Sequence, residues 1–369
     1  MDKLLLEKIL TRFDKFKVCL IVDGHLKIGY GHVTRSLNLL RLLNLNKSEV
    51  LIVSICDEQC EDIFRKYGYY YKKFGLNDFV KAECYISFII NFPNVRCVIT
   101  DLAYALPNKN IVNLEYFHIK LSKLYKLVII DGFSKYSFRK FFNGVRCDLL
   151  LAPYVGEISG YGGIAPHLEY VGPEFAVVGK SYWKRKNKRI FTPKDNKVLL
   201  TCGGTDPYGI TEEILALLCQ CDQYLRIMIT IGQGFNHKRE LDMSGIVKSS
   251  RHHIRFLKAK FDLSKYFEWS DVAISSGGLT KYELAYQGVP AIYVAKSEEH
   301  LAGNSEFSML NTSVSLDMRS NKFADNFNRT VLELLKDVDW RESFSKNGTI
   351  YFSYGKIKVL LTSIKSLIS

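Results

Sequence analysis

Three short glycine-bearing turns are the parts of this 369-residue chain best suited to chemistry. They cover residues 29–32, 202–207 and 275–280, and each lies between a strand-like apolar run and a helix-like run. A strand that ends in glycines and opens a helix presents backbone N–H groups beside the positive end of the helix dipole, which suits a phosphate. The turns therefore predict an anionic ligand, and we expect a nucleotide diphosphate compound.

The first turn, Gly29-Tyr30-Gly31-His32, adds a side chain that can accept a proton. It lacks the third glycine of a dinucleotide-binding fingerprint, so the glycines alone are weak evidence. His32 is expected in the first turn of the next helix, where the helix dipole disfavours the imidazolium and a neutral imidazole can act as a general base. We therefore take His32 as the candidate base and Gly31 as a binding residue.

Three aspartates, Asp23, Asp101 and Asp131, each end an apolar run on the same predicted side of a sheet. An aspartate at a strand end often caps the following helix, so a structural role is expected to be commoner than a catalytic one. Asp23 is the best catalytic candidate of the three, because it shares the expected ligand-side edge with His32.

The two later turns form a pair in one half of the chain, which makes them a stronger signal than either alone. Together they could hold a diphosphate from two sides, although each could also be a plain strand-to-helix connection. Glu283 follows in the next helix, where its carboxylate could accept bonds from ribose hydroxyls or simply face solvent. The candidate binding residues here are Gly203, Gly204, Thr205, Ser276, Gly277, Gly278, Thr280 and Glu283.

The elements that must position these turns alternate between strand-like and helix-like runs. In the first half we expect strands at 18–23, 50–55, 96–101, 127–131 and 148–152, and helices at 31–43, 58–67 and 108–125. In the second half we expect strands at 197–201, 225–231, 271–275 and 290–294, and helices at 210–219, 280–287, 321–336 and 340–367. Short apolar runs separated by helices are typical of parallel sheets covered on both faces.

The chain is long enough for two domains, and its two halves repeat the same rhythm. We expect an α/β protein with two doubly wound, Rossmann-like domains facing across a cleft, where ligands lie beyond the carboxyl ends of the strands. The predicted boundaries are 1–180 for the first domain, 181–196 for a basic linker, and 197–369 for a nucleotide-diphosphate-binding domain.

Composition narrows the class of protein. Hydrophobic residues make up 47% and charged residues 24%, as in a globular protein. No apolar run reaches the roughly 18 residues of a membrane-spanning helix, and no secretory signal is recognisable. The nine cysteines are scattered without Cys-x-x-Cys spacing, which fits a reducing compartment. We therefore expect a cytoplasmic protein, with the inner face of a membrane as an alternative location.

The net charge of +13 admits several partners. No zinc spacing, aromatic RNA-binding motif or helix-turn-helix pattern accompanies it, so no nucleic-acid partner is expected. An anionic substrate or an anionic membrane surface fits the charge equally well. An apolar stripe near the start is compatible with peripheral membrane association or with packing on the domain. It consists of Leu4, Leu5, Leu6, Ile9, Leu10 and Phe13.

Residues 28–35, Ile-Gly-Tyr-Gly-His-Val-Thr-Arg, resemble an element of one known family. It is the Gly-x-Gly-His-x-x-Arg element of the UDP-2,4-diacetamido-2,4,6-trideoxy-β-L-altropyranose hydrolases of pseudaminic acid biosynthesis. The likeness continues in family order through further short motifs, and the later ones are also similar to the wider GT-B group of glycosyltransferases. These motifs lie at 100–101, 130–131, 148–151, 171–176, 203–207 and 277–283.

The resemblance implies a GT-B fold, a UDP-sugar substrate and inverting hydrolysis at the anomeric carbon, with no metal or other cofactor. His32 would activate the attacking water, the two later turns would hold the diphosphate, and Glu283 would bind the ribose. The chain departs from the family in lacking an arginine shortly before Asp23. It also lacks the family's Asn-Gln pair near the end, where Asn304 is the remaining candidate for a sugar contact.

Hydrolysis is therefore the first functional hypothesis, and it would supply a free sugar for nonulosonic acids of surface polysaccharides. The second is a GT-B glycosyltransferase, in which a glycan or lipid-linked hydroxyl replaces water. A nucleic-acid-binding protein ranks well below both, because it leaves the glycine turns unexplained. The exact sugar, the nucleotide base and the oligomeric state stay open.

Overall fold

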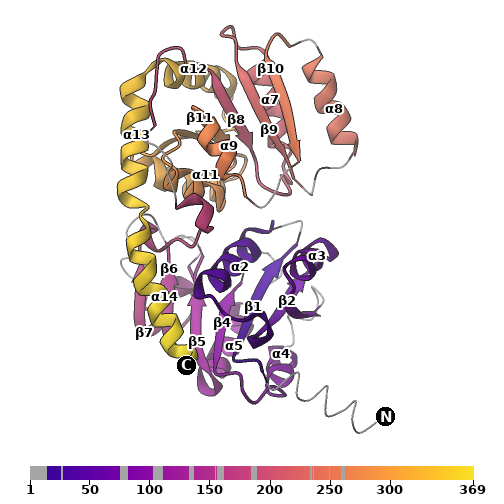
Figure 1. Cartoon of the computed structure of the whole chain (residues 1–369), viewed down its shortest axis with the longest axis vertical. Coiled ribbons are helices and arrows are strands. Elements are labelled where there is room, and N and C mark those ends of the chain that lie inside the picture. The colour runs from indigo at the N-terminus through magenta and orange to yellow at the C-terminus, as the bar shows by residue number, and fades with distance from the viewer. Residues whose placement is uncertain are drawn as a thin grey trace. The chain divides into compact units, whose positions relative to one another are not determined.

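The structure is a computed structural model that divides into two compact units (Figure 1). It describes residues 15–25, 28–74, 82–102, 111–132, 137–153, 155, 162–183, 189–232, 235, 237–248, 250–258 and 262–369. The first unit comprises Met1–Val177 and Gly355–Ser369, and the second comprises Val178–Tyr354. The chain thus returns to the first unit at its end, whereas the sequence predicts one domain from 197 to 369. The stretch 181–196, expected as a linker, groups with the second unit.

The first unit contains a seven-stranded sheet in the order β3-β2-β1-β4-β5-β6-β7. All of its neighbouring strands run parallel. The direction of chain progression along the sheet reverses between β1 and β4, which makes this pair a topological switch point. The strands are β1 (Val18–Gly24), β2 (Val50–Cys56), β3 (Tyr70–Phe74), β4 (Cys97–Asp101), β5 (Lys126–Ile130), β6 (Val145–Ala152) and β7 (Ile164–Val171).

The helices of the first unit begin and end at residues suited to those positions. Asp57 caps α3 (Glu58–Tyr67) by accepting from the N–H of Cys60, and Gly68 ends it with a left-handed φ of 71°. The helix α2 (Gly31–Leu43), which follows β1, also lies at its predicted residues. The others are α4 (Ala82–Ile89), α5 (Ile111–Leu124), α6 (Phe138–Phe141) and α14 (Tyr354–Ile368).

The second unit contains a six-stranded sheet in the order β10-β9-β8-β11-β12-β13, with its switch point between β8 and β11. Its neighbouring strands also run parallel. The strands are β8 (Lys197–Thr201), β9 (Arg226–Ile231), β10 (His253–Lys258), β11 (Val272–Ser275), β12 (Ala291–Ala295) and β13 (Ser313–Asp317). The sheet core is built from apolar residues on these strands and on the flanking helices.

The chain end forms two helices where the sequence predicts one over 340–367. The helix α13 (Val338–Tyr351) stops at Phe352, whose φ of −110° and ψ of 84° are not helical. Phe352 is buried and stacks on Phe307 with ring centroids 5.3 Å apart, so burial of this ring accompanies the break. The remaining helices are α7 (Ile210–Cys219), α8 (His237–Val247), α9 (Ser264–Trp269), α10 (Thr280–Tyr286), α11 (Glu298–Met309) and α12 (Phe323–Lys336).

The described residues 189–196 of the expected linker are fastened to the rest of the second unit. Arg189 donates to the carbonyl oxygens of Ser270 at 2.7 Å and Gln287 at 3.2 Å, and Arg341 pairs with Asp195 at 2.7 Å. The lysine-rich residues 184–188 lie outside the described part of the chain. Arg189 therefore contributes to packing, although the sequence predicts an interdomain linker here. Within the described residues, no helix has both the length and the apolar character needed to cross a membrane.

Candidate functional site

The switch point of the first unit brings His32 together with a carboxylate from a neighbouring strand. Asp101 is the last residue of β4, and Val22 of β1 is its register partner. His32 follows β1 in the first turn of α2, at the residue that the sequence predicts. Because parallel strands end at one edge of the sheet, the turn after β1 and the end of β4 meet there.

Asp101 is the centre of a dense hydrogen-bond network. Its Oδ1 lies 2.6 Å from His32 Nδ1 and 2.5 Å from Arg35 Nη2. Its Oδ2 accepts from Arg35 Nε at 3.0 Å and from Ser36 Oγ at 2.8 Å. The carboxylate is fully buried, while the side chain of His32 is 23% exposed. Asp101 thus anchors one nitrogen of an imidazole that remains accessible.

The charges in this network determine which nitrogen of His32 can react. Burial by itself raises the pKa of Asp101, but Arg35 and His32 outweigh it and hold this pKa well below its usual range. An ionised Asp101 can only accept, so His32 carries its proton on Nδ1 and leaves Nε2 free of that bond. This is the tautomer that a general base needs. The sequence predicts only that the end of α2 favours a neutral His32. The structure adds a carboxylate that fixes the tautomer of the imidazole.

The other two strand-end aspartates have different surroundings. Asp131 accepts from the N–H groups of Gly132 and Phe138, each at 2.8 Å, and from Ser137 Oγ at 2.5 Å. It therefore has the capping role that the sequence predicts. Asp23 is 1% exposed at the end of β1. The described carboxylate contact to His32 comes from Asp101, which the sequence ranks below Asp23. The ranking was uninformative because residue types do not tell which strand end lies beside the histidine.

The turn before His32 is held by Tyr30. Its hydroxyl lies 2.8 Å from Gln59 Oε1 and 3.1 Å from Asp57 Oδ2. Tyr30 also occupies the N-cap position of α2 and makes no side-chain capping bond there. A Cβ added to Gly31 would meet nothing within 4 Å. The first turn of α2 thus keeps open space beside the histidine, as a binding role for Gly31 requires.

In the second unit the two glycine turns leave adjacent strands. Thr201 at the end of β8 is the register partner of Ser275 at the end of β11. The turns therefore start side by side at the switch point, where ligands of open parallel sheets are bound. Gly203 has a φ of 81°, and Gly277 and Gly278 have φ values of 103° and 64°. Such values favour glycine, and they explain why each turn contains it.

The N-terminus of α7 is already occupied by a carboxylate. Asp206 accepts from the N–H groups of Ile210 at 2.9 Å and Thr211 at 3.0 Å. Arg239 Nη2 donates to the same carboxylate at 2.8 Å. The sequence predicts that this helix end faces a phosphate, but two of its N–H groups are engaged by Asp206. The exposed backbone of Gly203 and Gly204 is what the turn still offers to a ligand.

The second turn is packed against α11. Asn304 is 2% exposed, and its Nδ2 lies 3.4 Å from the carbonyl oxygen of Ser276. Lys281 is 1% exposed and donates to the carbonyl oxygen of Gly303 at 2.6 Å. Burial lowers the pKa of Lys281 to about 8. These contacts give Asn304 a positioning role at the turn. Lys281, which joins α10 to α11, was not predicted from the sequence, although it lies in the 277–283 motif.

Gly277 is expected to tolerate no side chain. Its φ of 103° is strained for other residues, and an added Cβ would lie 2.3 Å from Asn304 Oδ1. The Gly277→Ala variant should lose about 1–3 kcal/mol of unfolding free energy, measured by urea denaturation. Gly245→Ala in α8 is the control, because no atom lies within 4 Å of the Cβ that this substitution adds. Equal stability of the two variants would contradict the expected strain.

Glu283 lies in α10 and is 5% exposed. Burial is the largest of the causes that raise its pKa to about 8, and the charge of Asp262 adds to it, while a hydrogen bond from Tyr182 opposes it. Thr280, at the start of α10, is half-buried. The sequence places Glu283 on a solvated helix face or on a ribose, and the structure excludes the solvated face.

This raised pKa predicts how stability depends on pH. Between the ordinary value of 4.5 and about 8, the folded protein keeps a proton on Glu283 that the unfolded chain has lost. The free energy of unfolding should therefore fall as pH rises, by up to about 1.4 kcal/mol per pH unit. Glu283→Gln removes this contribution, so its stability relative to wild type should increase from pH 5 to pH 8 in urea denaturation. Exposed Glu333→Gln is the charge-matched control, and parallel profiles for Glu283→Gln and wild type would contradict the prediction.

Solved structures with the same architecture align over nearly the whole chain. MurG of Acinetobacter baumannii aligns over 95% of this chain and 99% of its own, with 13% identity and a TM-score of 0.62. The spinosyn rhamnosyltransferase SpnG complexed with thymidine diphosphate aligns over 95% and 100%, with 11% identity and a TM-score of 0.64. Anabaena Alr3699/HepE in complex with UDP and glucose aligns over 95% and 99%, with 11% identity and a TM-score of 0.59. The chain therefore has the GT-B fold, and this prediction from the sequence is confirmed.

Among curated proteins, the chain is 24% identical over 295 residues to the uncharacterized protein MJ1062 of Methanocaldococcus jannaschii. It is 22% identical over 140 residues to the spore coat polysaccharide biosynthesis protein SpsG of Bacillus subtilis. These matches cover 76% and 37% of this chain, and 56% and 40% of the respective relatives. The chain thus spans about half the length of the curated relatives that it matches. No protein-family model matches it.

Proposed function

We propose that the chain transfers a glycosyl group from a nucleoside diphosphate sugar to an acceptor hydroxyl, with His32 as the general base. The acceptor oxygen attacks the anomeric carbon, the bond from that carbon to the diphosphate breaks, and the nucleoside diphosphate leaves with the electron pair. The acceptor proton goes to Nε2 of His32. UDP is the nucleotide that we expect.

The observation that carries this proposal is the buried Asp101, with its Oδ1 2.6 Å from His32 Nδ1. A fully buried carboxylate that orients a partly exposed imidazole stabilises the imidazolium that forms when the base takes a proton. His118 shows the contrast: it is fully buried, its Nδ1 lies 2.7 Å from the carbonyl oxygen of Leu114, and burial lowers its pKa to about 4. His32, in contrast, combines a buried carboxylate partner with a side chain that is 23% exposed.

Binding of the nucleotide is assigned to the glycine turns of the second unit. Gly203, Gly204, Gly277 and Gly278 lie at the switch point, where backbone N–H groups can donate to diphosphate oxygens. In this proposal Ser276 and Thr280 add hydroxyls, and Glu283 accepts bonds from the ribose. Support comes from fold neighbours whose structures contain thymidine diphosphate or UDP.

Hydrolysis is the second candidate, and the motif at residues 28–35 favours it. In that reaction water takes the place of the acceptor hydroxyl, and His32 keeps its role. The substrate would be a UDP-linked 2,4-diacetamido-trideoxy sugar, and the products would be UDP and the free sugar for pseudaminic acid biosynthesis. The glycosyltransferase neighbours support the first candidate better.

The two candidates are separated by measuring nucleoside diphosphate release from a panel of UDP- and TDP-sugars. The panel includes the diacetamido sugar nucleotide, and each compound is incubated with and without acceptor alcohols, oligosaccharides and lipid-linked saccharides. Transfer predicts release that depends on an acceptor and yields a glycosylated product. Hydrolysis predicts the same rate in buffer alone. Absence of UDP and TDP binding by calorimetry, together with absence of release from every donor, would overturn both.

A further inference from the structure

A cavity of about 770 Å³ lies in the first unit, away from the switch point. It is formed where the strands begin, because Lys17 directly precedes β1, Glu49 precedes β2 and Arg96 precedes β4. Backbone bonds join these positions: the N–H of Lys17 donates to Glu49 at 2.8 Å, and the N–H of Arg96 donates to Lys17 at 2.9 Å. His32 and Asp101 lie at the opposite edge, about 20 Å along the seven-residue β1.

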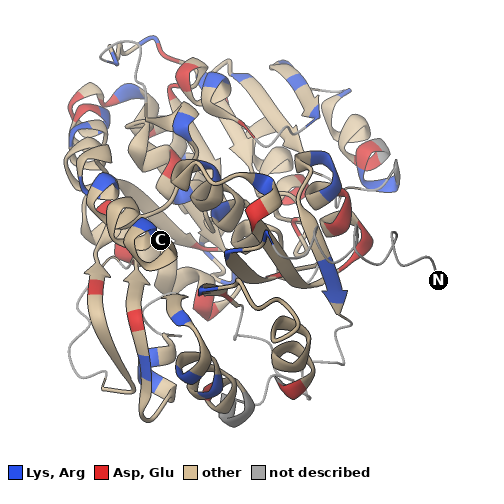
Figure 2. Cartoon of the chain, turned by 60° about the horizontal axis from the view of Figure 1, so that its bottom comes forward, with Lys and Arg blue, Asp and Glu red and all other residues tan. Residues whose placement is uncertain are grey.

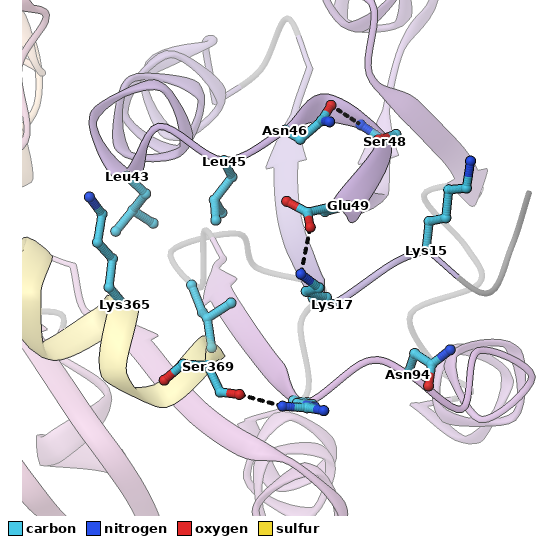
Figure 3. A pocket seen from close by; sticks show the side chains of 12 residues that line it. Lys15, Lys17, Leu43, Leu45, Asn46, Ser48, Glu49, Asn94, Lys365 and Ser369 are labelled. Carbon is cyan, nitrogen blue, oxygen red and sulfur yellow. Dashed lines mark hydrogen bonds and ion pairs between the residues drawn. The ribbon is translucent and has the colours of Figure 1, made fainter.

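The lining of this cavity is predominantly basic. Among its side chains, Lys15, Lys17, Arg96 and Lys365 carry positive charge and Glu49 carries negative charge. Arg96 donates to the main-chain oxygen of Ser369, which also lines the cavity. Lys17 pairs with Glu49 at 2.6 Å, as the dashed line in Figure 3 marks. Lys15 and Lys365 make no side-chain hydrogen bond or ion pair within the described part of the chain. Their ammonium groups are therefore available to an external anion.

One side of the cavity is apolar. Leu43, the last residue of α2, and Leu45, two residues further on, lie on the side of Lys365, and Lys15 lies on the other side (Figure 3). Ile368 from the last turn of α14 completes this apolar wall. Leu45 is half-buried, whereas Leu43 and Ile368 are buried. A ligand that fits both walls has an anionic group and an apolar part. The lipid phosphate headgroup with its attached glycerol and acyl carbons has this chemistry.

The sequence just before Lys15 has the same character. The apolar stripe between Leu4 and Phe13 ends two residues before Lys15, and the stripe itself lies outside the described residues. Over the rest of the chain, Lys and Arg are interspersed with Asp and Glu in both units (Figure 2). The net charge therefore does not single out a surface, whereas the cavity joins unpaired lysines to an apolar wall.

We propose that this cavity binds the phosphate headgroup of an anionic membrane lipid and attaches the first unit to a membrane surface. Lys15 and Lys365 contact the phosphate, and Leu43, Leu45 and Ile368 contact the lipid's apolar part. Because the cavity and the His32 edge lie at opposite ends of the same strands, attachment leaves the His32 edge uncovered. Membrane binding is then separable from turnover, and it does not depend on which reaction the chain catalyses.

The test is sedimentation of the full chain with vesicles of phosphatidylcholine, with and without phosphatidylglycerol, at low and high salt. We expect wild type to bind only the anionic vesicles and to be released by salt. The Lys15→Glu/Lys365→Glu variant should bind at least about tenfold more weakly. The Lys336→Glu/Lys346→Glu variant makes the same charge change on exposed lysines of the second unit and should bind like wild type.

Two results would overturn the proposal: no binding of wild type to anionic vesicles, or equal binding by the two double variants. Calorimetric binding of glycerol phosphate without any vesicle binding would identify a site for free phosphate compounds instead of a membrane. Thermal unfolding of the Lys15→Glu/Lys365→Glu variant verifies that it is folded, and its turnover of water-soluble donors should equal that of wild type. Failure of glycosyl transfer would leave the vesicle result unchanged, so the two proposals are tested separately.

Discussion

His32→Ala is expected to lower turnover of the nucleotide sugar by about 10²–10⁴-fold, the contribution of a positioned general base. The variant should still bind UDP with the affinity of wild type, because the glycine turns belong to the second unit. It should also stay folded, because Asp101 keeps its bonds to Arg35 and Ser36. Steady-state release of the nucleoside diphosphate and calorimetric titration with UDP measure the two effects.

Two further variants show whether the loss is specific to His32. His253→Ala removes an exposed imidazole on β10 and should leave turnover unchanged. His25→Ala tests the neighbouring histidine, which is 5% exposed and directly follows β1. If turnover survives in His32→Ala and disappears in His25→Ala without loss of folding, the base has been assigned to the wrong residue.

Asp101→Asn is expected to lower turnover on the order of 10²–10⁴-fold, although Asp101 touches no substrate in the proposed mechanism. A neutral asparagine lacks the negative charge that keeps the proton of His32 on Nδ1. It also cannot stabilise the imidazolium that forms when His32 takes a second proton. The variant should also lose about 3–5 kcal/mol of unfolding free energy, because the substitution removes the buried negative charge that pairs with the 13%-exposed side chain of Arg35. Activity is therefore compared per folded molecule, with urea denaturation measured in parallel.

Asp131→Asn is the matched control for this prediction. Asp131 is also fully buried directly after a strand of the same sheet, and it also accepts several hydrogen bonds. Its replacement should destabilise the fold and leave turnover per folded molecule unchanged, because the three bonds given above cap the turn after β5. A comparable loss of turnover in both variants would mean that Asp101 acts through stability alone.

Local patterns in the sequence predict much of the architecture. The helices α2, α3 and α7 and the strand β8 have the predicted residues, because apolar periodicity and residues such as Asp57 and Gly68 mark their limits. The half-exposed edge strand β3 and the strand β10 were not predicted, since their polar faces weaken the apolar signal. The break at Phe352 also escaped prediction, because it accompanies a ring contact with Phe307, 45 residues away.

For the candidate site, the sequence by itself determined which residues could do chemistry: an imidazole after a glycine turn, and glycine pairs at two strand ends. Only the tertiary structure decided that Asp101, which the sequence ranks below Asp23, contacts His32, and that Asp206 occupies the N-terminal end of α7. The reason is physical. Spacing along the chain reports local conformation, whereas the partner of a side chain is set by strand order and by which charges the fold buries together.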